Sequence, residues 1–425
     1  MNGVGLPAGG WLPLYATART NGVAAPLLLV PLLSALLLGL VLLSAGPAGA
    51  SPSAAEASPS PSSSVVSLVV TPDNVVYGTP VAVSGEVLPA LADQAVSITL
   101  DGAEVAAAVT GADGRYAAQF TPQRGGAVLA TLVTEGVSSA PLALSVRPDV
   151  TITTATPVPF LTLHVVVSVL PAGYAGTITT TVLHNDATQA TVAGQASGGS
   201  AAFDLPLWGV GQFRLRAALA ADGGLAERTV AKDVRAARRR LAVGASGAHV
   251  RGVLTALQRL KVRIPSLGST MTRDRSDAIV AFQKAYGLPR TYVVDADDWA
   301  RLDAAQPVKP RYVSPYDHLE VDKTRQILMM VRGGRLRALI AVSTGATGNT
   351  PEGVFRIQQK HPSTTSLSGG AVLYRTMGFL GNFAIHGYAP VPPYPASHGC
   401  VREPMWVADW MYDRTALGER VYIYR

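Results

Sequence analysis

The only cysteine of the 425-residue chain, Cys400, lies in the segment Ser397-His-Gly-Cys-Val-Arg402. A single cysteine excludes an intramolecular disulfide and any metal site built from several cysteines. His398 and Arg402 each lie two residues from Cys400, and side chains at i±2 share one face of an extended chain. Because a neighbouring cation stabilises a thiolate, this arrangement predicts a reactive Cys400 with a lowered pKa.

A second imidazole lies fourteen residues upstream, at His386, which is followed by Gly387. A nucleophile and a base are the minimum for covalent acyl transfer. The backbone N–H groups of residues 398–400 are candidates for binding an oxyanion, because Gly399 adopts conformations that other residues avoid. No carboxylate lies near either histidine in the sequence, so the group that orients His386 is a backbone carbonyl or a distant residue.

The pattern His386-Gly…Ser-His-Gly-Cys-x-Arg402 resembles the signature of the L,D-transpeptidase family. Other pieces of residues 312–425 agree with it, namely Glu320-Val-Asp, Gln326, Val342-Ser-Thr-Gly345, and Thr350-Pro-Glu-Gly353 with Phe355. The resemblance implies an all-β catalytic domain and a cysteine nucleophile that acts on peptidoglycan stem peptides. It also implies acylation by β-lactams of the carbapenem class.

The resemblance assigns a role to each residue of the motif. Cys400 is the implied nucleophile and His386 its base. The remaining implied site residues shape the pocket and bind substrate, and they are Ser397, His398, Gly399, Arg402 and Gly387. No metal or cofactor is expected. Tyr374, Tyr388 and Tyr394 are candidates for lining the cleft, although each is more readily explained as a packing aromatic.

Several alternative functions stay open at this point. An L,D-carboxypeptidase would use the same acyl-enzyme with water as the acceptor. A zinc enzyme would use His386, His398 and Cys400, but a His-Glu-x-x-His helix is absent and the Cys–Gly–His link is awkward for three ligands. A papain-like peptidase is disfavoured because it places its cysteine before its histidine. A non-catalytic wall-binding protein would require an unreactive thiol.

The elements expected to position these residues begin with strands in the C-terminal domain, residues 312–425. Apolar runs at 327–331 and 339–342 flank the turn Gly333-Gly334 and predict two of them.

A change of period marks the segment before this domain. Apolar residues there recur at helical spacing and predict a small helical bundle over residues 238–306. Five pieces resemble the peptidoglycan-binding helical domain, namely Gly244-Ala-Ser-Gly247, Leu257-Gln-Arg-Leu260, Ala281-Phe-Gln-Lys284, Gly287-Leu288 and Trp299-x-x-Leu302. The resemblance implies wall binding, and the alternative is a bundle that no longer binds.

Alternating apolar and polar residues, separated by turn signals, dominate residues 65–234. This texture repeats once, over 65–147 and 148–234, and predicts two tandem immunoglobulin-like β-sandwiches. Their expected role is that of a spacer. The whole chain is thus expected to be a multi-domain, mainly β protein. At 48 % hydrophobic residues it is not disordered, and its 42 glycines and 30 prolines follow no collagen period.

The N-terminal residues 1–50 predict export. An uncharged run at 24–43 follows Arg19, and Ala48-Gly49-Ala50 is a cleavage candidate. The run is longer than an ordinary signal-peptide core and as long as a membrane span, so both a cleaved signal and an uncleaved anchor are open. A Ser/Pro/Ala linker over 51–64 follows.

Charge is divided unevenly along the chain. Residues 1–234 hold 8 basic and 14 acidic residues, whereas 235–425 hold 27 and 14. The basic half is therefore expected to meet anionic polymers. The expected partners are stem peptides, anionic wall polymers and, if the anchor stays uncleaved, the membrane; nucleic acid is not expected. The predicted location is the cell envelope.

Overall fold

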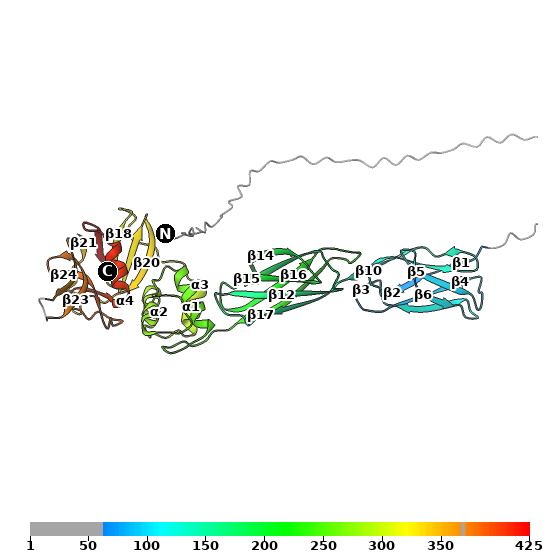
Figure 1. Ribbon diagram of the computed structural model, residues 1–425, viewed down its shortest axis with the longest axis horizontal. Coiled ribbons are helices and arrows are strands. Elements are labelled where there is room, and N and C mark those ends of the chain that lie inside the picture. The colour runs from blue at the N-terminus through cyan, green and yellow to red at the C-terminus, as the bar shows by residue number, and fades with distance from the viewer. Residues whose placement is uncertain (1–62, 367–369) are drawn as a thin grey trace, which may run out of the picture. The chain divides into compact units, whose positions relative to one another are not determined.

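The computed structural model describes residues 63–366 and 370–425 (Figure 1). The predicted export segment and most of the predicted linker lie outside these residues. Within the described part of the chain, no helix is long and apolar enough to cross a membrane.

Two sheets make up the first β-rich region. One holds β1 (Val65–Val66), β2 (Val69–Thr71), β4 (Val81–Leu88) and β7 (Arg115–Phe120). The other holds β3 (Asn74–Val76), β5 (Ala95–Leu100), β6 (Ala103–Val109), β8 (Gly126–Leu132), β9 (Val137–Ser138) and β10 (Leu142–Arg147). Alternation explains the burial: β4 turns Val81, Val83 and Val87 inward.

The second β-rich region repeats this plan with two sheets. One holds β11 (Asp149–Thr154), β12 (Thr162–Leu170) and β15 (Ser200–Pro206), and the other β13 (Thr177–His184), β14 (Ala187–Gln195), β16 (Gly211–Leu219) and β17 (Arg228–Ala236). Buried side chains from both regions form one continuous cluster that extends from Val66 to Ala236. The prediction of a mainly β chain is confirmed, and the immunoglobulin-like assignment stays a prediction.

Three helices follow, α1 (Ala248–Arg259), α2 (Arg273–Tyr286) and α3 (Ala296–Ala304). Residue types that favour helix ends occur at the termini of α2 and α3. Thr272 accepts from the backbone N–H at the start of α2, Gly287 ends that helix with a left-handed φ of 70°, and Asp295 begins α3 with a capping box.

The helices share a hydrophobic core with the sheet that follows them. Their buried residues form one cluster with Ile327, Met329 and Leu339, which come from that sheet. The backbone joins the two as well, because the N–H of Arg263 donates to Leu339 and the N–H of Leu339 donates to Lys261. The helical segment therefore packs directly on the sheet.

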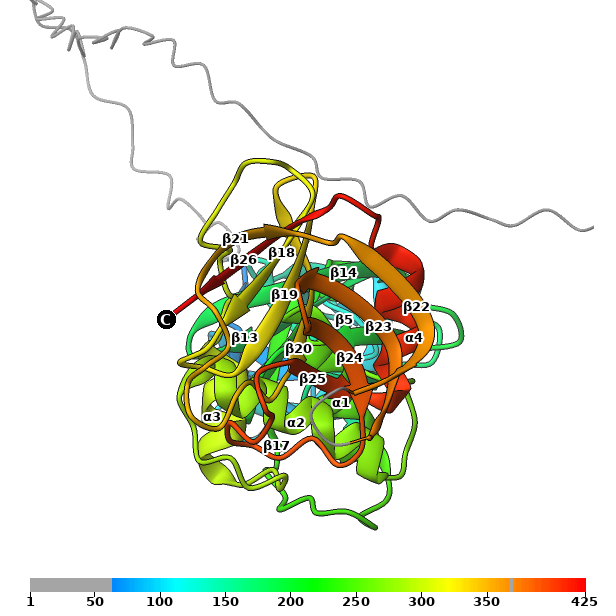
Figure 2. The ribbon, with the colours of Figure 1, turned by 90° about the vertical axis from the view of Figure 1, so that its left-hand side faces the viewer.

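The C-terminal region has two sheets and one helix. The first sheet has the order β20 (Arg335–Ala341), β19 (Ile327–Arg332), β18 (His318–Asp322), β26 (Arg420–Tyr424) and β21 (Gly353–Arg356). The second has the order β22 (Gln359–Thr365), β23 (Val372–Leu380), β24 (Phe383–Tyr388) and β25 (Val401–Pro404), and Figure 2 shows its first three strands side by side.

The helix α4 (Met405–Arg414) packs on β23 and β24. It buries Val407, Ala408 and Met411, a helical spacing that the expectation of an all-β domain overlooked. That expectation is wrong in this one respect. The core between the two sheets supports the strands that carry the candidate site.

Candidate active site

Strands β24 and β25 bring His386 and Cys400 together. The two strands are parallel, with His386 opposite Arg402 and Ile385 opposite Val401. Continuing this register places Cys400 opposite Ala384. Since side chains of paired residues project from the same face of a sheet, Arg402 and His386 share one face, and Cys400 directly precedes β25.

A tight turn of residues 397–400 presents the thiol. The hydroxyl of the buried Ser397 donates to the carbonyl of Cys400 at 2.5 Å and accepts from the N–H of Gly399 at 3.0 Å. Gly399 has a φ of +138°, and a Cβ there would lie 2.5 Å from Phe383. Both the backbone conformation and the lack of space therefore require glycine at this position.

A neighbouring loop braces the same turn. The backbone N–H of Ala346 donates to the carbonyl of Ser397 at 2.8 Å. The side-chain amide of Asn349 donates through Nδ2 to the carbonyl of His398 at 2.8 Å, and the hydroxyl of Thr350 donates to that of Gly399 at 2.7 Å. With the Ser397 hydroxyl on Cys400, every carbonyl of residues 397–400 is bound. The backbone of the turn is thus fixed before any substrate arrives. The sequence signalled this loop only through Thr350-Pro-Glu-Gly353 and did not single out Asn349.

The environment of Cys400 raises its pKa. The cause is burial of the thiol, which the N–H of Ala384 and the charge of Arg402 offset only in part. The Cys400 sulfur lies 3.5 Å from the carbonyl oxygen of Asn382, to which a neutral thiol donates. The prediction of a lowered pKa is therefore wrong for this structure, because desolvation outweighs the nearby guanidinium.

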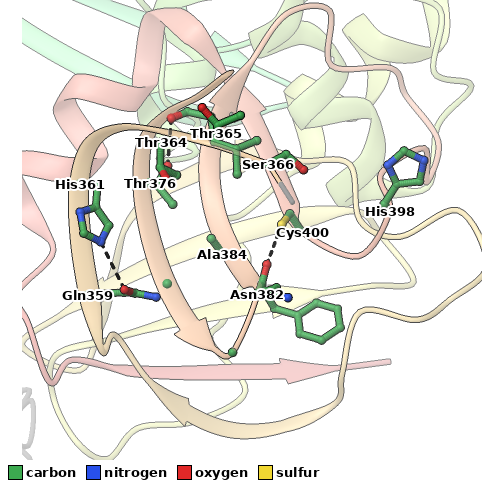
Figure 3. Close-up of a pocket in the computed structure, with 14 residues that line it drawn as sticks. Gln359, His361, Thr364, Thr365, Ser366, Thr376, Asn382, Ala384, His398 and Cys400 are labelled. Carbon is green, nitrogen blue, oxygen red and sulfur yellow. Dashed lines mark hydrogen bonds between the residues drawn. The ribbon is translucent and has the colours of Figure 1, made fainter. Parts of the chain in front are cut away.

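The side chain of His398 does not point toward the Cys400 thiol. Its side chain is exposed, and Figure 3 shows its ring directed away from the Cys400 sulfur. The turn at Gly399 breaks the extended geometry that would have placed the two side chains on one face.

His386 is almost fully buried, with 2 % of its surface exposed, and its tautomer is set by its neighbour. Its Nδ1 lies 3.0 Å from the carbonyl oxygen of Gly387. A carbonyl only accepts, so Nδ1 carries the proton and Nε2 keeps its lone pair. Burial lowers the pKa of His386, and the charge of Arg402 adds to that effect. The orienting group that the sequence left open is thus a backbone carbonyl.

Arg402 is held from three sides. Its backbone exchanges two hydrogen bonds with Ser343, each of 2.9 Å. Its guanidinium donates to the carbonyl of Ala396 at 3.1 Å and lies 4.2 Å from the ring centre of Tyr388. The Tyr388 ring also meets His386 edge-on, with 6.0 Å between centroids. Arg402, Tyr388 and His386 therefore form one packed group.

The Cys400 thiol opens into a cavity of about 480 Å³ (Figure 3). Cys400 and His398 line it, and the other walls come from β22, β23 and the start of β24. Sequence reasoning missed Thr364, Thr365 and Asn382 among these. Of the three tyrosine candidates none lines this cavity: Tyr374 donates to Asp409, Tyr388 packs on Arg402, and Tyr394 is exposed.

The alternative zinc site does not form in the part of the chain described. No three His, Cys, Asp or Glu side chains there are grouped so that they could hold a metal ion. Nδ1 of His386 donates to the carbonyl of Gly387, and the side chain of His398 is exposed.

Glu403, three residues after Cys400, is fully buried. Neither of its carboxyl oxygens has a hydrogen-bond partner among the described residues. Burial raises the pKa of this carboxyl well above its ordinary value, so the folded chain holds Glu403 neutral. The unfolded chain ionises Glu403 above about pH 4.3, and the stability of the fold therefore falls as pH rises through that value.

Replacing Glu403 by methionine should stabilise the protein. An unpaired buried polar group costs about 1–3 kcal/mol, and the apolar side chain removes this cost. We expect a higher melting temperature for Glu403→Met, with a gain that is larger at pH 8 than at pH 5. Thermal unfolding at both pH values measures it, with the exposed Glu135→Met as the matched control. A lower melting temperature at pH 8 would mean that Glu403 has a partner.

Comparison with known proteins assigns this region to a family. Residues 316–423 match the L,D-transpeptidase catalytic domain. An L,D-transpeptidase structure from Xylanimonas cellulosilytica is 32 % identical, with 44 % of this chain and 98 % of that chain covered and a TM-score of 0.42. One from Stackebrandtia nassauensis is 22 % identical, with 43 % and 93 % covered and a TM-score of 0.30. The comparison with curated proteins gave no match.

Proposed function

Since this chain belongs to the L,D-transpeptidase family, we propose that it cross-links peptidoglycan stem peptides through a thioester on Cys400. One observation carries the proposal: the thiol opens into a cavity and directly precedes the strand that pairs with the strand of His386, whose Nδ1–H is bound by the Gly387 carbonyl so that Nε2 keeps its lone pair. A nucleophile, a base of defined tautomer and room for a peptide are what acyl transfer requires.

Acylation begins from a neutral pair. The pKa of Cys400 is raised and that of His386 is lowered, so the thiol holds its proton until the reaction. Nε2 of His386 takes that proton as the sulfur attacks the amide carbonyl of the donor stem peptide. The tetrahedral intermediate then collapses, the C–N bond breaks, and the leaving amine of the terminal D-residue takes the proton from Nε2. The product is a thioester on Cys400.

Transfer to the acceptor reverses these steps. The acceptor amine gives a proton to Nε2 of His386 and attacks the thioester carbonyl. The C–S bond breaks, the sulfur recovers the proton, and the new amide is the cross-link. No electron is gained or lost, so the two half-reactions need no further reactant.

Two N–H groups are proposed to bind the oxyanion. Ser397 already occupies the N–H of Gly399, which leaves those of His398 and Cys400 among the three candidates. The bound carbonyls of residues 397–400 hold these dipoles in place, and a preorganised donor acts without reorganisation during the reaction.

The rest of the proposal concerns place and partners. Action on peptidoglycan fits a cell-envelope location, with the segment before residue 51 as an export signal or anchor. The basic residues after position 234 favour attraction to anionic wall polymers, and the helical segment is the proposed wall-binding module. Carbapenems are proposed as inhibitors, since they offer a strained carbonyl to the same thiol.

Intact-mass measurement tests the function directly. After mixing with a tetrapeptide-bearing muropeptide, the protein should gain the mass of the donor minus that of the released D-amino acid, and a carbapenem should leave one adduct on Cys400. Adding an amine-bearing acceptor should yield a cross-linked product. Hydrolysed product alone would indicate the carboxypeptidase. A protein unmodified by both reagents would exclude Cys400 as the nucleophile.

A further inference from the structure

Lys284, in the last turn of helix α2, is a buried lysine that the proposed mechanism does not use. Only 2 % of its surface is exposed, although lysine is among the residues least often buried. Its Nζ donates to the carbonyl oxygen of Val342, at 2.7 Å. An apolar side chain of the same length would fill this place between helix and sheet without the cost of burying an amine. Packing alone therefore does not explain the lysine.

The charges around Lys284 do not explain its burial either. Its pKa is lowered to about 7, mainly by burial and further by the positive charge of Arg290, while the charge of Asp277 opposes the shift. Burial raises the pKa of Asp277 to about 6, and its carboxyl accepts from the indole N–H of Trp406 at 3.2 Å. The described hydrogen bond of the amine is thus to a neutral carbonyl, at Val342.

Val342 begins a buried segment, residues 342–345, which is bonded to the strand next to the base. Its second residue, Ser343, exchanges two backbone hydrogen bonds of 2.9 Å with Arg402. Arg402 lies opposite His386 in the parallel pair of β24 and β25. The position of this segment therefore helps to set the position of β25 beside His386.

The same segment is bonded to the turn that presents the thiol. The carbonyl of Thr344 accepts from the N–H groups of Ala396 at 2.9 Å and of Ser397 at 3.0 Å. The hydroxyl of Ser397 in turn donates to the carbonyl of Cys400. The supports of the nucleophile and of the strand beside the base thus start from adjacent residues of one backbone segment.

We propose that Lys284 is a positioning residue for the cysteine turn and strand β25, acting through the carbonyl of Val342. Gln326 holds residues 342–345 from the sheet, since its backbone carbonyl accepts from the N–H of Val342 and its side chain exchanges hydrogen bonds with Thr344. Lys284 holds the same segment from the helices. The consequence for catalysis rests on the proposed function, whereas the positioning itself rests on these contacts.

Lys284→Met tests the role, because methionine keeps the length of the side chain and removes the donor. We expect the maximal rate of acylation by a donor muropeptide to fall about tenfold, since small displacements of reacting groups are costly. The donor concentration that gives half this rate should change little, because none of residues 342–345 is among the described residues that line the cavity. Lys309→Met, at an exposed lysine between α3 and β18, is the matched control.

Stability separates positioning from a merely structural role. In Lys284→Met the relief from burying an amine and the loss of the bond to Val342 oppose each other, so the melting temperature should stay close to that of wild type. Lys284→Leu, a shorter side chain without a donor, should show the same loss of rate at its own stability. A rate that follows the melting temperature across the two variants would overturn the positioning role.

Amide hydrogen exchange provides a measurement that needs no turnover. The N–H groups of Ser397 and Arg402 donate to Thr344 and Ser343, so their protection depends on the segment staying in place. By NMR, both should exchange about tenfold faster in Lys284→Met than in wild type or the control. Unchanged exchange, or an unchanged maximal rate, would overturn the inference. Faster exchange, in a protein whose wild type the donor does not acylate, would support the positioning and overturn the proposed function.

Discussion

Cys400→Ala is expected to abolish both acylation by a donor or carbapenem and formation of any cross-linked product. Cys400 is the only cysteine of the chain, so no other side chain can form a thioester. Cys400→Ser should be nearly inactive, because a hydroxyl ionises far less than a thiol and His386 alone must activate it. Intact mass after incubation with a carbapenem and product analysis with a muropeptide measure both losses.

The fold should survive these changes. The Cys400 sulfur contacts only backbone groups of Asn382 and Ala384 among the described hydrogen bonds, and the turn is held by Ser397 and the neighbouring loop instead. A melting temperature close to that of wild type therefore serves as the control. An adduct that persists on Cys400→Ala protein would place the nucleophile elsewhere.

His386→Ala is expected to lower the rate of acylation by substrate about 10²–10⁴-fold, the usual contribution of a positioned general base. The loss is large because burial raises the pKa of Cys400, so little thiolate is present at neutral pH without the base. Alkylation by iodoacetamide, which needs only the thiolate, should change far less. The two rates measured on the same protein separate proton transfer from thiol ionisation.

The pH dependence of kcat/KM should report the direction in which the pKa of His386 is shifted. Since the pKa of His386 is lowered, the imidazole remains a free base below the ordinary histidine value of about 6.5, and activity should persist to lower pH than that value suggests. The exposed His398→Ala is the matched control, with a much smaller loss of rate. If His398→Ala instead removes the reactive thiolate while His386→Ala leaves rate and titration unchanged, the two roles are reversed.

The roles proposed for Cys400 and His386 come from the motif and the family that it resembles, whereas local strand geometry could be predicted only in part. The i±2 rule expects Arg402 and Cys400 on one face, and Arg402 does lie in β25 opposite His386, with Cys400 directly before that strand. The same rule failed for His398, because the chain turns at Gly399 between the two residues. A rule for extended chain applies only where the backbone is extended, and the sequence shows this break only through the glycine itself.

Burial was the quantity that the sequence could not supply. The neighbours of Cys400 along the chain suggested a stabilised thiolate, whereas the folded environment desolvates the thiol and raises its pKa. Glu403 is a second example, because a glutamate beside a proline would ordinarily be expected at the surface and this one is fully buried. The braces from Asn349 and Thr350 are separated from the turn by about fifty positions, and no local pattern reports such contacts.

The core shared by helices α1–α3 and strands β19 and β20 has an evolutionary consequence. A domain that is merely tethered can be exchanged between proteins by recombination at its linkers. Here one face of the sheet, with Ile327, Met329 and Leu339, is buried together with the side chains of the helices. Inheritance of the two parts is therefore coupled, and a lineage that replaced the helices would have to replace this sheet face in the same step.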